Sequence, residues 1–105
     1  MLIIPIVAAL LSSVTATPAE LGNCVRDKAV ELSSIRKPAK SLAPVAIERC
    51  KDIFEKLVVA RDATAAKDGE RASSRPANSR AYRQSLNKLL TQLAITTIDE
   101  RRRAR

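Results

Sequence analysis

Apolar side chains recur at every third or fourth position in three stretches of the chain, which is the spacing of one face of an α-helix. The first stretch runs from about Glu20 to Ser34, and the second begins near Ser41 and extends toward Ala66. The third lies within residues 79–98. The pattern therefore predicts an all-α protein, with an antiparallel helical hairpin and a third amphipathic helix in a small three-helix arrangement.

The first helix has one face that is apolar except at Lys28, whose methylene stem can lie along the apolar surface with its ammonium outside. Arg36, Lys37 and Pro38 should end this helix, because cations suit a helix C-terminus and proline disfavours helical backbone before it. The face comprises Leu21, Cys24, Val25, Lys28, Leu32 and Ile35.

The second helix has the clearest apolar stripe, over more than three turns, opposite a face of alternating charges. With Ser41 as its N-cap, Pro44 falls in the first turn, where a missing N–H is tolerated. Gly69 is expected to stop this second helix, and the sequence pattern predicts one continuous helix before it. The stripe comprises Ala46, Ile47, Cys50, Ile53, Phe54, Leu57 and Val58.

Residues 69–78 predict a polar linker, after which Asn78 or Ser79 caps the third helix. Its apolar positions are Tyr82, Leu86, Leu89, Leu90, Leu93 and Thr97. The simplest role of this stripe is to cover the hairpin, and the alternative is self-association. The face that would associate comprises Leu86, Leu89, Leu90 and Leu93. Residues 99–105 are expected to form a basic tail.

Cys24 and Cys50 are the two cysteines of the chain, and each falls on an apolar face of the predicted hairpin. If the second helix begins at Ser41, both lie at similar distances from the connecting turn, within reach of a disulfide. The sequence thus predicts a disulfide-closed hairpin over residues 17–68. A zinc site needs about four ligands, and with two cysteines and no histidine neither a metal nor a cofactor is expected.

The N-terminal segment Met1–Ala19 carries no charged side chain and contains a short apolar block, Leu2–Leu11. Val14 and Ala16 stand at the −3 and −1 positions of a signal-peptidase site, so residues 1–16 are interpreted as a signal peptide cleaved after Ala16. Cleavage after Ala19 is the second choice. The block is too short to span a bilayer. We therefore expect a periplasmic or secreted protein, in which the cysteines would be oxidised.

Three short motifs lie around the cysteines: Asn-Cys-Val at 23–25, Lys-Pro-Ala at 37–39 and Ala-Ile-Glu-Arg-Cys at 46–50. This stretch resembles a loose group of short exported helical proteins of Gram-negative bacteria. Their function is unknown, and they carry two cysteines on either side of a Pro-Ala turn. The resemblance implies an exported helical hairpin and no particular activity.

The formal net charge is +8, and most of the excess lies in the last quarter of the chain. These cations either form a solvated tail or contact an anionic partner such as phospholipid head groups, lipopolysaccharide or an acidic protein surface. The candidate contacts are Arg80, Arg83, Lys88, Arg101, Arg102, Arg103 and Arg105.

Composition disfavours two classes of function. The chain has no histidine for general base catalysis, no glycine-rich phosphate loop and no reduced cysteine expected, so an enzyme is not predicted. Phe54 and Tyr82 are the only aromatic residues, which predicts an aliphatic core and disfavours nucleic-acid binding by base stacking. We expect a small exported non-enzymatic protein with a binding or structural role in the cell envelope. The alternative is a cationic protein that binds anionic membranes or other polyanions through its C-terminal third.

Overall fold

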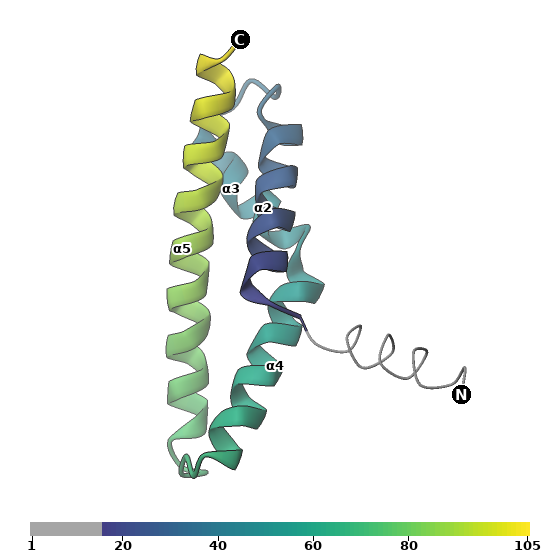
Figure 1. Cartoon of the computed structure of the whole chain (residues 1–105). Helices are drawn as coiled ribbons and strands as arrows, with labels where there is room; N and C mark the ends of the chain where they lie inside the picture. Colours follow the sequence, from purple (N-terminus) through teal and green to yellow (C-terminus); the bar gives the residue numbers. More distant parts are fainter. Residues whose placement is uncertain (1–15) are drawn as a thin grey trace, which may run out of the picture.

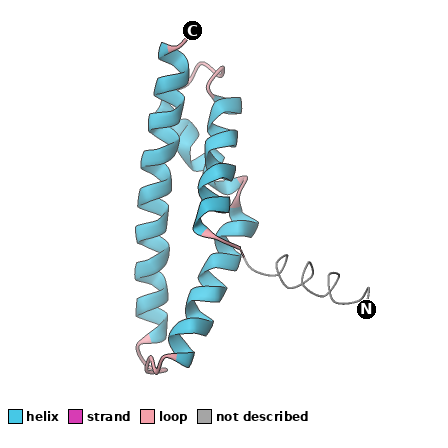
Figure 2. Cartoon of the chain, in the orientation of Figure 1, coloured by secondary structure: helices cyan, strands magenta, loops and turns pink. Residues whose placement is uncertain are grey.

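The computed structural model describes residues 16–105, and this part of the chain contains four α-helices and no strand (Figures 1 and 2). The helices are α2 (Pro18–Leu32), α3 (Ala39–Glu48), α4 (Lys51–Lys67) and α5 (Arg75–Arg103). The prediction of an all-α protein is confirmed. The predicted signal peptide, apart from its last residue, lies outside the described residues.

Helix α5 is the longest element, and the other three helices pack along it. Its 29 residues extend about 43 Å at the usual helical rise. Helices α2 and α3 lie beside its C-terminal half, and α4 lies beside its N-terminal half (Figure 1). The loop of residues 33–38 between α2 and α3 therefore lies at the same end of the molecule as the C-terminus, and the α4–α5 turn lies at the opposite end.

Local chemistry accounts for the start of α2 and the end of α4. Thr17 caps α2 by accepting a hydrogen bond at Oγ1 from the Glu20 N–H, at 3.1 Å. After α4, Gly69 adopts a φ of +93°, a left-handed conformation that glycine takes without strain. The Glu70 N–H then donates to the Ala65 carbonyl at 2.9 Å, which completes a Schellman motif. The predicted stop at Gly69 is confirmed.

The prediction of one continuous second helix is wrong, because the helix is interrupted at Arg49 and Cys50, between α3 and α4. The Cys50 N–H donates to the Ile47 carbonyl, three residues back, at 2.9 Å, so the backbone tightens before the helix resumes. This change of direction lets α3 pack against α2 and α5 while α4 follows the other half of α5 (Figure 1). The apolar period continues across the junction, so the pattern alone predicts no break.

The start of α3 also differs from the prediction. The helix begins at Ala39 with Pro38 at the N-cap position, so Ser41 is not the cap. Pro44 consequently lies inside the helix rather than in its first turn. Its ring nitrogen carries no hydrogen, so the Lys40 carbonyl does not receive the usual helical bond from residue 44.

Helix α5 is longer than predicted at both ends. It begins at Arg75, with Pro76 in the first turn where the missing N–H breaks no helical bond, so the predicted linker 69–78 is shorter. It then continues past the predicted range 79–98 through most of residues 99–105. The predicted basic tail is thus largely the last turn of a helix, where positive side chains suit the negative end of the helix dipole.

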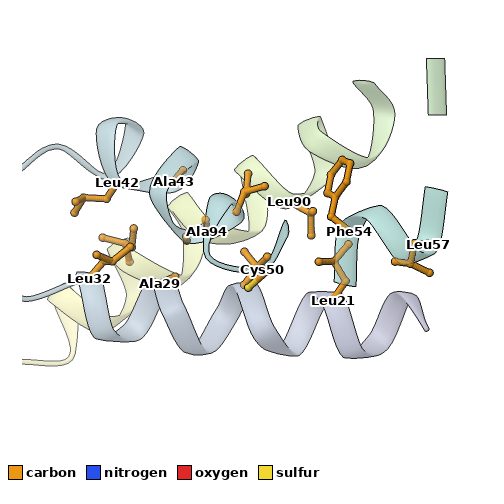
Figure 3. Close-up of a cluster of buried hydrophobic side chains, with 14 of the residues drawn as sticks. Leu21, Ala29, Leu32, Leu42, Ala43, Cys50, Phe54, Leu57, Leu90 and Ala94 are labelled. Carbon is orange, nitrogen blue, oxygen red and sulfur yellow. The ribbon is translucent and has the colours of Figure 1, made fainter. Parts of the chain in front are cut away.

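The core is aliphatic, as predicted, with Phe54 as the one buried aromatic side chain of the described residues (Figure 3). Small side chains let the helices approach closely: Ala29, Ala43 and Ala94 are fully buried on α2, α3 and α5. The buried apolar residues are Leu21, Val25, Ala29, Leu32, Leu42, Ala43, Ala46, Ile47, Cys50, Phe54, Leu57, Val58, Leu90, Ala94 and Ile98.

Cys24 and Cys50 form a disulfide bond, with their Cα atoms 6.1 Å apart. Cys24 lies in the middle of α2, and Cys50 lies at the junction of α3 and α4. Cys50 is 2% exposed and belongs to the core (Figure 3). The bond therefore holds the point at which the chain changes direction against the first helix.

Candidate functional site

The leucine face of α5 is used mainly inside the molecule. Leu90 is buried, and Leu86 and Leu93 pack partly buried against the core. Leu89 is 68% exposed, so its predicted place on the buried stripe is corrected. The buried side of α5 continues one turn later at Ala94, because the contacts with α2 and α3 select that side of the helix.

The seven basic residues proposed as contacts for an anionic partner do not form one cluster. Arg80 and Lys88 are exposed on α5, about 32 Å and 20 Å before Arg101 at the usual helical rise. Arg83 pairs with a carboxylate of the chain itself. The remaining four lie together at the C-terminal end of α5.

Arg83 and Glu55 form a bidentate pair between α5 and α4. The Nη1–Oε1 and Nη2–Oε2 distances are 2.6 Å and 2.7 Å. These hydrogen bonds lower the pKa of the Glu55 carboxyl and raise the pKa of the Arg83 guanidinium. Arg83 is therefore engaged by an internal anion and is a weak candidate for an external one.

A second charged cluster fastens the α4–α5 turn. Arg61 donates to Asp62 at 2.6 Å and to Glu70 at 2.5 Å, and Ser79 donates to the other Asp62 oxygen at 3.0 Å. The bond from Arg61, then the bond from Ser79, lowers the pKa of the Asp62 carboxyl, and the bond to Asp62 raises the pKa of Arg61. The carboxylates of Asp62 and Glu70 at this end of the molecule are thus bound by Arg61, which is engaged inside the molecule.

The opposite end concentrates positive charge. We define the basic end as residues 33–40, which comprise the α2–α3 loop and the first residues of α3, together with residues 99–105. Two segments far apart in the sequence meet here (Figure 1). Its cations are Arg36, Lys37, Lys40, Arg101, Arg102, Arg103 and Arg105. Asp99 and Glu100 are its only carboxylate side chains.

Arg102 joins the two segments of the basic end. Its Nε donates to the Ser33 carbonyl at 3.1 Å, and its Nη2 donates to the carbonyls of Ile35 and Lys37, both at 2.7 Å. One guanidinium thus satisfies three carbonyls of a loop that has no regular structure. Arg102 shapes the loop instead of projecting freely into solvent.

Ser33 gives the basic end a second internal anchor. Its side chain is buried and donates from Oγ to the Val30 carbonyl at 2.7 Å, while Arg105 donates to the same Oγ at 3.1 Å. In residues 16–105, the side chains of Arg36, Lys37 and Arg101 have no hydrogen-bond or ion-pair partner. These three side chains are free to bind an anion.

An open hollow of about 610 Å³ lies over this loop. Its lining contains four cationic side chains and no carboxylate side chain, so the side chains around it favour a phosphate or carboxylate group. The lining residues are Ser33, Ser34, Ile35, Arg36, Lys37, Pro38, Arg102 and Arg105.

The sequence interpretation missed the contribution of the loop. It assigned Arg36 and Lys37 to the end of the first helix and omitted Lys40. The signal was present, because three cations stand within the five residues 36–40. What the sequence did not reveal is that this run lies beside the C-terminal arginines.

Among the described residues, no three acidic or cysteine side chains lie close enough together to hold a metal ion. Nor does any helix of this part combine the length and the apolar character that crossing a membrane requires. Comparison of the chain with protein-family models, with curated proteins and with solved structures finds no match in any of the three.

Proposed function

We propose that this is an exported, non-enzymatic helical protein that binds an anionic component of the cell envelope through its basic end. The observation that carries the proposal is the meeting of Arg36 and Lys37 with the C-terminal arginines at one end of the molecule. Cations gathered on one surface attract a polyanion more strongly than the same cations spread along the chain.

The disulfide and the start of α2 support export. A disulfide bond forms and persists in an oxidising compartment such as the periplasm or the cell exterior. Cleavage after Ala16 would leave Thr17 as the first residue and keep the cap of α2, whereas cleavage after Ala19 would remove that cap. These observations favour Ala16 as the cleavage site.

Binding to inorganic polyphosphate at low ionic strength tests the proposed surface. The Arg36→Gln/Lys37→Gln variant should bind several-fold more weakly than the parent, and added salt should weaken the binding of the parent. The control is Arg80→Gln/Lys88→Gln, which removes the same charge from exposed residues outside the basic end. Equal losses in both variants, or no binding by the parent, would contradict the proposal.

The intact mass of the protein purified from the cells that make it tests export and oxidation together. We expect the mass of residues 17–105 less two hydrogens. A mass that includes Met1 would contradict export, and a mass with both thiols reduced would contradict the oxidising compartment.

A further inference from the structure

We infer that the partner of the basic end is an anionic lipid bilayer and that the α2–α3 loop inserts Ile35 among its head groups. This inference rests on the proposed function and deepens it by naming the partner. It depends on an apolar side chain within the basic end that charge attraction leaves unexplained.

Ile35 is 41% exposed, and it lies in the loop directly before the free cations Arg36 and Lys37. A soluble polyanion would use the two cations and leave the isoleucine in water. A bilayer offers phosphate groups to the cations and, just beneath them, an apolar phase for Ile35. Val59 and Leu89 are more exposed, but they lie on α4 and α5 outside the basic end.

Insertion of a loop is normally opposed by its backbone, because carbonyl groups that lose water need other hydrogen-bond donors. Here the carbonyls of Ile35 and Lys37 already accept bonds from Arg102 Nη2 at 2.7 Å. The Ser33 carbonyl accepts from Arg102 Nε, and Pro38 has no N–H to satisfy. These three carbonyls of the loop can therefore leave water at the bilayer surface without losing their hydrogen bonds.

The arrangement of charge sets the direction of approach. The free side chains of Arg36, Lys37 and Arg101 belong to the same end as Ile35. The charged cluster of the α4–α5 turn, where Asp62 and Glu70 lie, is at the opposite end (Figure 1). An anionic surface would orient the molecule with the loop toward the lipid, so that attraction by charge and burial of Ile35 act together.

A tryptophan in place of Ile35 tests insertion, since the chain has no tryptophan of its own. With vesicles of phosphatidylglycerol and phosphatidylcholine, the emission of the Ile35→Trp variant should shift to shorter wavelength and be quenched by brominated acyl chains. Vesicles of phosphatidylcholine alone should cause neither change. The control is Leu89→Trp, at an apolar position that is 68% exposed and outside the basic end; its emission should stay that of tryptophan in water.

Ile35→Ser separates insertion from charge attraction. We expect it to weaken binding to the anionic vesicles about tenfold, because the exposed part of the side chain no longer enters an apolar phase. Its binding to polyphosphate should not change. Circular dichroism and urea denaturation of each variant establish that it is folded.

Other outcomes decide between the inference and the proposed function. Insertion is refuted if the parent binds polyphosphate but not vesicles. It is also refuted if Ile35→Ser binds vesicles as well as the parent does and the tryptophan in place of Ile35 stays in water. In both cases the basic end remains a polyanion site. If the parent binds neither probe at low salt, the proposed function fails as well.

Discussion

Replacing Arg102 with alanine should destabilise the protein more than replacing any exposed arginine of α5. The substitution removes hydrogen bonds to the carbonyls of Ser33, Ile35 and Lys37, which lie 65 to 69 residues away in the sequence. It also removes a positive charge from the C-terminal end of α2, where Ser33 is the C-cap. Both losses act on the same loop.

The magnitude follows from the surroundings of the three carbonyls. The bond to Ser33 is partly buried and should contribute about 1 kcal/mol, whereas the bonds to Ile35 and Lys37 are exposed and should contribute about 0.5 kcal/mol each. The expected loss in the free energy of unfolding is therefore about 2 kcal/mol. For a domain of this size, such a loss lowers the melting temperature by roughly 8–16 °C.

Urea denaturation followed by circular dichroism measures this loss. The matched control is Arg101→Ala, which removes an exposed arginine from the same turn of α5, together with the same favourable interaction with the dipole of α5. Arg102→Lys should recover little of the loss, because one ammonium cannot reproduce the fork that reaches three carbonyls. If Arg102→Ala costs no more than Arg101→Ala, or if lysine restores full stability, the structural role assigned to Arg102 is wrong.

Two further predictions concern the disulfide and the ion pairs. Replacing Cys24 and Cys50 with alanine should lower the free energy of unfolding by about 3.5 kcal/mol through the entropy of a loop with a sequence separation of 26, and equal urea midpoints for variant and parent would contradict this. The ion pairs lower the pKa values of Glu55 and Asp62 below their ordinary 4.5 and 3.8. Each pair should therefore stabilise the protein at pH values above the ordinary pKa, and this stabilisation should disappear as the pH falls through the lowered pKa. NMR titration of both carboxyls measures these pKa shifts, and ordinary pKa values would refute the pairing. The Glu55→Gln variant should lose less stability than the parent when the pH is lowered from 6 to 3.

The sequence by itself determined the class of fold, the character of the core and the cysteine pairing. The three- and four-residue period of apolar side chains marks helices whatever they pack against. Two aromatic residues in the whole chain can build only an aliphatic core. Gly69 ended a helix as predicted, because the left-handed conformation it supplies is a local property of the chain.

The tertiary structure decided where the second predicted helix breaks and which side of α5 is buried. The apolar period runs through Cys50 without interruption, so the change of direction there depends on how α3 and α4 pack against α5. Leu89 and Leu90 are adjacent and equally apolar, yet one is 68% exposed and the other 5%. Packing partners select between such neighbours, and the period of a single helix does not contain that information.

The basic end belongs wholly to the tertiary structure. Arg36 and Lys37 form a short basic run in the sequence, and Arg102 belongs to another near the C-terminus. Only the path of the chain, which carries α5 back along α2 and α3, brings the two runs together (Figure 1). Side-chain bonds between residues so far apart depend on that path. For this reason, the predicted basic tail is anchored to the α2–α3 loop through Arg102 and Arg105 and belongs to the surface proposed to bind anions.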